Sequence, residues 1–147
     1  MSDGLRAELG EALSAVVADM QAAATDLRQA LADERAALDQ ADPAALDRSG
    51  DAKQALLRRL EQLETERRQL AQASPSAAMP RGAWSRVLEL LQECQRTNQR
   101  NGRLIGQRLQ HVRRALAVLT GASADADVYG PAGQLRHARR SSPLAQA

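Results

Sequence analysis

The stretch from Trp84 to Thr120, WSRVLELLQECQRTNQRNGRLIGQRLQHVRRALAVLT, decides the fold class of this chain. Its stripe positions recur at alternating spacings of four and three, the repeat of a helix that packs one face against partner helices. The ends of the stripe are apolar, but its middle carries polar residues, which fix register, and a glycine, which permits close backbone approach. The predicted seam consists of Trp84, Leu88, Leu91, Gln95, Asn98, Gly102, Ile105, Leu109, Val112, Leu116 and Leu119, with Asn101 beside it.

The composition favours thin helical packing over a thick globular core. The 147 residues include 30 Ala, whereas Leu, Ile, Val and Phe together number only 28, and there is one Trp and one Tyr. Such a chain can bury a seam of Leu and Ala between helices. We therefore predict an all-α fold: an elongated antiparallel three-helix bundle or coiled coil over residues 1–120, followed by a flexible C-terminal tail at 121–147.

Helix boundaries follow from the capping residues. A first helix is predicted over about 4–40, because Leu and Ala keep helical spacing there. Asp42 is a good N-cap and Pro43 suits a first helical turn, so a second helix is expected over 43–73. Ser49-Gly50-Asp51 predicts a kink or a short break within it. The loop at 74–83 contains two prolines, and a third helix is expected over about 82–120, with Gly121 as its stop.

Charge is unevenly distributed along the chain. Residues 1–50 hold four Arg and ten acids, a net of −6, whereas residues 51–100 sum to +3 and residues 101–147 to +5. We favour an acidic first helix lying beside basic later ones over nucleic-acid binding, because no aromatic residues interleave the arginines to stack bases. Lys53 is the only lysine. Either its stem packs in the seam while its amine reaches water, or it lies on a solvated flank.

No catalytic or metal-binding constellation emerges from the sequence. His111 and His137 are the only histidines and match no zinc spacing. Cys94 is expected on a helix flank as a half-buried structural thiol. Four acids of the first helix are interpreted as a solvated face: Glu8, Glu11, Asp33 and Glu34. We expect no enzyme, no cofactor and no metal.

Targeting features predict a cytoplasmic protein. A lone cysteine fits a reducing compartment. The N-terminal residues lack the basic and apolar regions of a signal peptide. The longest apolar run is far below the ~20 residues that a membrane span needs.

Two aromatic residues have alternative interpretations. Trp84 is favoured as a plug at one end of the bundle, and the alternative is an exposed anchor for a partner. Tyr129 stands in a segment with no predicted core to bury it. It is either a partner contact, since tyrosine offers contact area at low entropic cost, or an incidental solvated side chain.

Several of these elements together resemble the FlgN family of bacterial flagellar export chaperones. The similarity spans about residues 9–133 and includes LADERAALDQADPAAL from Leu31 to Leu46, which begins in the first helix, KQALLRRLEQLETER from Lys53 to Arg67, and Trp84 with its following leucines. Its most specific parts are Cys94-xxx-Asn98-xx-Asn101-Gly102 and Val128-Tyr129-Gly130-Pro131-xx-Gly133. The Arg-rich end from Arg136 to Arg140 departs from the family pattern, and we assign it no role.

The resemblance implies a cytosolic chaperone for hook–filament junction proteins. Such a chaperone binds their C-terminal amphipathic helices through its own C-terminal part, prevents their aggregation, and delivers them to the type III export apparatus. An exposed apolar stripe on the third helix would provide a groove wall for an incoming helix, with the tail closing over it. The predicted partner-binding residues are Asn98, Asn101, Gly102, Ile105, Leu109, Val112, Leu116, Leu119, Val128, Tyr129, Gly130 and Pro131.

Two other classes of function remain open. A structural homodimeric coiled coil would bury the same stripe between two copies and bind no cargo. A nucleic-acid binder acting through the Arg-rich tail would show sequence-independent binding that disappears with salt.

Overall fold

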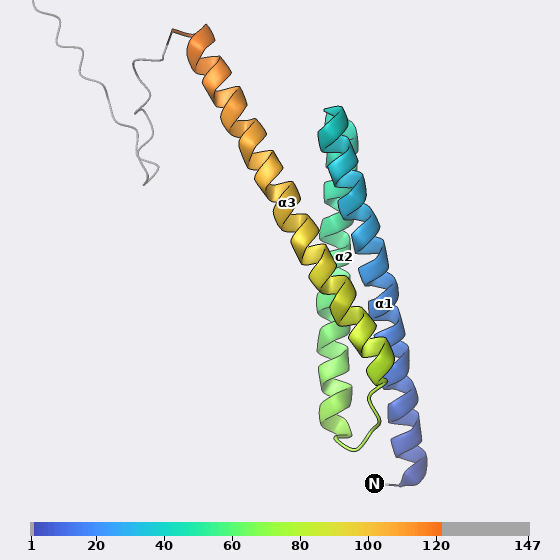
Figure 1. Cartoon of the computed structure of the whole chain (residues 1–147). Helices are drawn as coiled ribbons and strands as arrows, with labels where there is room; N and C mark the ends of the chain where they lie inside the picture. The colour runs from blue at the N-terminus through green and yellow to red at the C-terminus, as the bar shows by residue number, and fades with distance from the viewer. Residues whose placement is uncertain (1, 122–147) are drawn as a thin grey trace, which may run out of the picture. The chain divides into compact units, whose positions relative to one another are not determined.

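The computed structural model describes residues 2–121, which form three α-helices and no strand. These are α1 (Asp3–Gln40), α2 (Pro43–Ala73) and α3 (Arg81–Leu119) (Figure 1). The prediction of an all-α chain with three helices is confirmed. The described residues divide into two units at Ile105, residues 2–105 and 106–121, which are described separately below.

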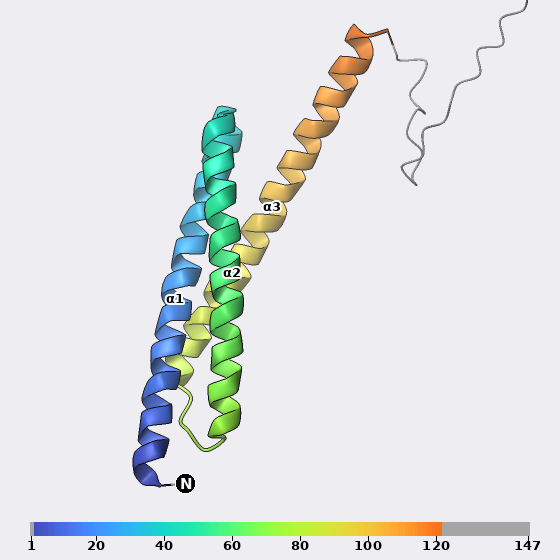
Figure 2. The same ribbon diagram turned by 180° about the vertical axis from the view of Figure 1, so that it is seen from behind.

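A two-residue turn connects α1 to α2. Ala41 adopts the left-handed conformation with φ 51°, and its N–H donates to the Leu38 carbonyl at 3.3 Å. Asp42 then caps α2, because its carboxylate accepts from the Ala45 N–H at 3.0 Å, and Pro43 occupies the first helical turn. The short turn makes α1 and α2 antiparallel neighbours, as both views show (Figure 2).

The predicted break at Ser49-Gly50 is wrong, since α2 continues as one helix through these residues, and a kink there stays a prediction. Ser49 is buried, and its hydroxyl donates to the Leu46 carbonyl within the helix at 3.0 Å. A glycine costs a helix only about 1 kcal/mol relative to alanine. Packing against α1 therefore outweighs the local preference for a break in the helix.

The core of the first unit is organised around α1. This helix buries a face of leucine, valine and alanine along most of its length, and α2 and α3 each contribute a few apolar side chains to it. Small residues such as Ala23 and Ala24 let neighbouring helices approach closely, as the alanine-rich composition suggested. The core cluster consists of Val16, Val17, Met20, Ala23, Leu27, Leu31, Leu60, Leu63, Val87 and Cys94.

The buried face of α3 differs from the predicted seam by about one residue. Val87, Leu90, Cys94 and Asn101 are buried, whereas the predicted seam residues Leu88, Gln95 and Asn98 are exposed. The reason is that α3 carries two adjacent apolar rows near its N-terminus, about 100° apart around the helix axis. The row that faces α1 contains the smaller Val87 and Cys94, and the bulkier row lies beside it.

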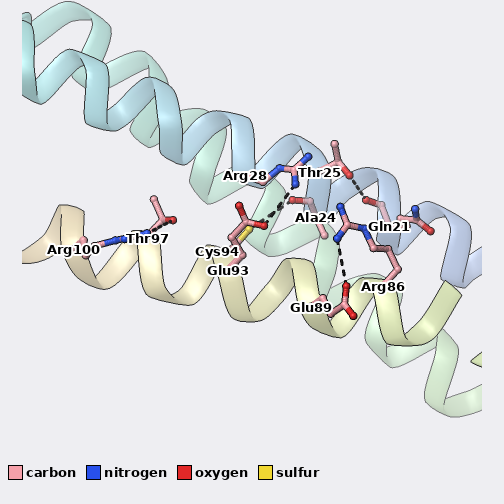
Figure 3. Close-up of polar contacts among 10 residues, drawn as sticks. All are labelled: Gln21, Ala24, Thr25, Arg28, Arg86, Glu89, Glu93, Cys94, Thr97 and Arg100. Atoms are coloured by element: carbon pink, nitrogen blue, oxygen red, sulfur yellow. Dashed lines mark hydrogen bonds and ion pairs between the residues drawn. The ribbon is translucent and has the colours of Figure 1, made fainter. Parts of the chain in front are cut away.

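Cys94 belongs to this core and not to a helix flank as predicted. Its side chain is 3% exposed, and Sγ donates to the Ala24 carbonyl of α1 at 3.6 Å (Figure 3). The neighbouring Glu93 pairs with Arg28 of α1 at 3.6 Å, near the surface. Because both side chains of this pair are more than 40% exposed, the pair contributes little stability. Among the described residues, no helix is long and apolar enough to cross a membrane.

Candidate partner-binding surfaces

Exposed apolar side chains form a stripe along the C-terminal part of α3. They recur every three or four residues, and each is at least 38% exposed, with Leu119 reaching 81%. We call this set the α3 stripe: Ile105, Leu109, Val112, Leu116 and Leu119. A contiguous apolar row in contact with water typically marks an interaction surface.

The residues around the stripe are basic. Between Cys94 and Gly121 the chain holds six arginines and no acidic residue. Long arginine stems can extend an apolar surface while the guanidinium groups stay solvated. The segment therefore combines an exposed apolar row with a net positive charge.

A polar cluster in the first unit joins residues from all three helices. Lys53 of α2 donates to Oε2 of Glu34 in α1 at 2.8 Å and to Oδ1 of Asn98 in α3 at 3.3 Å. Asn101 Nδ2 donates to Glu34 Oε1 and to the Leu31 carbonyl, both at 3.0 Å. We call Glu34, Lys53, Asn98 and Asn101 the polar cluster. It fixes α3 to α1 and α2 at one position along the helix.

The cluster corrects two sequence interpretations. Glu34 is 3% exposed, so it is not part of a solvated face. The side chain of Lys53 is 17% exposed, and its amine turns inward to Glu34 instead of reaching water or lying on a flank. A lysine and a glutamate at seam positions of neighbouring helices were the available signal for this ion pair, and the sequence reasoning did not connect them.

The predicted site residues of the Asn-xx-Asn-Gly element have different environments. Asn101 is 1% exposed and is used inside the first unit, with its Oδ1 unpaired. Asn98 is exposed and bonded to Lys53. Gly102 is exposed, and a Cβ added there or at Gly106 would meet nothing within 4 Å. The close backbone approach expected at Gly102 is therefore absent from the described residues.

A groove with a volume of about 740 Å³ runs between α2 and α3. Sequence reasoning did not predict it. The α3 wall of the groove is formed by the bulkier apolar row, which lies beside the row that faces α1, and α1 forms the floor. Its apolar lining consists of Met20, Leu27, Leu31, Leu57, Leu60, Trp84, Leu88, Leu91 and Cys94, and its polar lining of Lys53, Glu61, Glu64, Thr65, Arg68, Gln95 and Asn98.

Trp84 lines one end of this groove and is neither fully buried nor fully exposed. It packs against the core cluster, and the guanidinium of Arg67 lies over its ring, 4.5 Å from the centroid. Arg67 also donates twice to Glu64, at 2.7 and 2.9 Å. These hydrogen bonds from Arg67, with a further one from Arg68, lower the pKa of Glu64 against the opposing effect of burial.

The described residues show no constellation for catalysis or metal binding. They contain no group of three metal-ligating side chains. Burial, followed by the negative charge of Glu93, raises the pKa of Cys94, so its thiol stays protonated near neutral pH and makes a poor nucleophile. The tail residues Val128, Tyr129, Gly130 and Pro131 lie outside the described residues.

Comparison with known protein families identifies the family of this chain. A family model described as FlgN protein matches residues 1–137, which include the polar cluster, the groove, the α3 stripe and the Tyr129 segment. The chain belongs to the FlgN family. FlgN proteins are flagellar export chaperones, so the expected chaperone class holds, and the family is not one of enzymes. No curated protein and no solved structure matches the chain.

Within this FlgN-family chain, the residues that carry the resemblance serve different purposes. Asn101 completes the polar cluster and Cys94 fills the core, so these two positions support the fold. The apolar side chains of the α3 stripe, by contrast, are exposed.

Proposed function

We propose that this FlgN-family chain binds the C-terminal amphipathic helices of hook–filament junction proteins in the cytoplasm. Binding covers the apolar faces of these helices, which prevents their aggregation before they pass to the flagellar export apparatus. The observation that carries the proposal is the α3 stripe, an exposed row with the i, i+4, i+7 spacing that a helical partner recognises.

The energetics suit a chaperone that must release its cargo. Leu109 and Leu116 are about half exposed, at 50% and 54%. Covering the exposed half of such a side chain contributes on the order of 1 kcal/mol. Five stripe residues therefore supply several kcal/mol before the entropic costs of association and of ordering flexible segments, which offset part of that gain. The result is a moderate affinity that allows release.

The tail segment Val128-Tyr129-Gly130-Pro131 is proposed to add a second contact by closing over the bound helix. Support for this step comes from the sequence, where the chain's only tyrosine stands in a Gly- and Ala-rich surrounding. A truncation after residue 120 tests it. The truncated chain is expected to bind cargo peptide more weakly than the full chain does, whereas equal binding would place the whole contact on the helices.

The stripe is tested with Leu109→Asp/Leu116→Asp in the full chain. Calorimetric titration with peptides from the C-termini of both junction proteins is expected to show at least tenfold weaker binding. The matched control is Gln107→Asp/Gln110→Asp, which adds the same charge to exposed positions on the opposite face of α3. Unchanged affinity in the stripe variant, with helicity preserved by circular dichroism, would contradict the proposed contact.

The same exposed row also fits the alternative of a structural homodimer, since an apolar stripe can pair with its copy. Light scattering alongside the titration separates the two functions. A chaperone shows saturable peptide binding and a mass that rises by the cargo. A structural dimer shows twice the chain mass at every concentration and no response to the peptide.

A further inference from the structure

The α2–α3 groove is a slot with a polar contact between α2 and α3 near each end. At one end Lys53 donates to Asn98, and near the other Arg67 lies over Trp84. The lining residues span Lys53 to Arg68 on α2 and Trp84 to Asn98 on α3. At ~1.5 Å per helical residue, each wall is roughly 20 Å long, the length of about four helical turns.

The groove interior is apolar and incompletely covered. Leu57 and Leu88, on opposite walls, are 38% and 43% exposed, although both are large side chains that pack well when buried. A volume of about 740 Å³ lies within the range of specific binding sites. A slot four turns long with apolar walls fits the face of one amphipathic helix, which presents side chains at i, i+3, i+4 and i+7.

Two observations identify the occupant. First, the α3 residues that line the groove (Trp84, Leu88, Leu91, Gln95 and Asn98) repeat in the sequence with the same heptad spacing as the α3 stripe, so both sets suit the same kind of partner, an amphipathic helix.

Second, only some of the charged side chains that line the groove have an ion-pair partner. Lys53 is paired with Glu34, and Arg68 is paired with Glu64. Glu61 has no ion-pair partner among residues 2–121. A helix that docks here gains from a lysine or arginine placed opposite Glu61.

We propose that the α2–α3 groove receives about four turns of the cargo's amphipathic helix, with apolar side chains between Leu57 and Leu88 and a basic side chain facing Glu61. The inference rests on the proposed function, because the occupant is the same cargo. It goes further in placing a cargo contact on the first unit, outside the stripe and the tail.

Trp84 reports occupancy directly, because it is the only tryptophan and lines the groove. The test uses the full chain, a junction-protein C-terminal peptide without tryptophan, and acrylamide quenching of Trp84 emission. Saturating peptide is expected to lower the quenching constant at least twofold. A control peptide, also without tryptophan but with Asp at its apolar positions, is expected to leave the quenching constant unchanged.

Variants locate the effect. Leu57→Glu/Leu88→Glu is expected to weaken peptide binding at least tenfold, whereas Gln62→Glu/Gln92→Glu, with the same charge on exposed positions outside the groove, binds as the wild type does. Glu61→Lys is expected to weaken binding about threefold, and a peptide with its basic residue changed to Glu is expected to restore it.

The outcomes separate this inference from the proposed function. If the peptide binds, the stripe variant loses binding, and Trp84 quenching does not change, the groove is not a cargo site and the chaperone function stands. If the wild-type chain binds no peptide, the proposed function itself fails. Should Leu57→Glu/Leu88→Glu unfold, Trp84 protection in the wild-type chain decides the question alone.

Discussion

At the scale of single residues, the polar cluster is the most consequential feature of the first unit. A buried carboxylate is costly unless it is paired and hydrogen-bonded, and Glu34 receives a lysine amine and an amide at opposite oxygens. Removing one member leaves the other charge buried without compensation, which is worse than removing both. The cluster therefore favours one alignment of the three helices over shifted alternatives.

Lys53→Met is expected to destabilise the chain by roughly 3 kcal/mol, because Glu34 would remain buried without its cation. The double variant Glu34→Gln/Lys53→Met is expected to lose less than the sum of the two single variants. Urea denaturation followed by circular dichroism measures both effects. Gln54→Met, at an exposed neighbouring position on α2, serves as the control and should change stability by no more than about 0.5 kcal/mol. Additive losses in the double variant would show that the pair is not coupled.

Glu64 makes stability depend on pH. Its folded-state pKa is held below the ordinary value of 4.5, first by hydrogen bonds from Arg67. The stabilisation is therefore fully present above that ordinary value and is lost as pH falls through the lower folded-state pKa. Glu64→Gln should be less stable than the wild type at pH 7, and the difference should shrink below pH 4.5. Urea midpoints between pH 7 and pH 3 test this, with Glu66→Gln as the exposed control. A constant difference across that range would contradict it.

At the scale of elements, the turn between α1 and α2 and the middle of α2 each contain a residue whose local backbone conformation lowers stability. Ala41 has a left-handed backbone with φ 51°, a conformation that glycine adopts without the Cβ penalty. Gly50 is in a helix interior, where alanine is preferred by up to ~1 kcal/mol, and a Cβ there would meet nothing within 4 Å.

Opposite substitutions at these two sites should therefore both stabilise the chain. Ala41→Gly and Gly50→Ala are each expected to raise the unfolding free energy by about 0.5–1 kcal/mol, and their effects should add. Thermal denaturation can measure the gain. Leu46→Gly, which introduces a glycine into α2, should lower the stability and serves as a destabilising reference. A loss of stability in Gly50→Ala would indicate that α2 does bend at this residue in solution.

How far the sequence predicts these elements depends on which forces decide them. Asp42-Pro43 and Gly121 mark helix ends through local chemistry, and heptad spacing identifies helices, so both are readable from the sequence. The buried row of α3 is not, because Val87 and Leu88 belong to adjacent apolar rows and only packing against α1 chooses between them. For the same reason the α2–α3 groove, which is lined by the unchosen row, could not be foreseen.

At the scale of the whole molecule, the buried residues are confined to one part of the described sequence. All the buried residues within 2–121 lie between Leu13 and Asn101, and the polar cluster is complete at Asn101. The large apolar residues of 106–119 are at least half exposed. The charge follows the same division: residues 1–105 carry 14 basic and 16 acidic side chains, a net of −2, whereas 106–147 carry six and two, a net of +4.

This distribution predicts that a chain ending after Ile105 folds with nearly the stability of the full chain, within about 1 kcal/mol, because it keeps every buried contact. A chain ending after Thr97 should lose roughly 2–3 kcal/mol more, since it lacks Asn98 and Asn101 and leaves two bonds to buried acceptors unmade. Urea midpoints compare the two truncations, which differ by only eight residues. The 1–105 chain also lacks most of the α3 stripe, so it should bind cargo peptide more weakly than the full chain does. Excess peptide should still protect Trp84 from quenching, because every residue that lines the groove lies within residues 1–105. If the 1–105 chain is unfolded, the C-terminal part of α3 contributes to the stability of the fold, and its exposed leucines cannot be reserved for a partner.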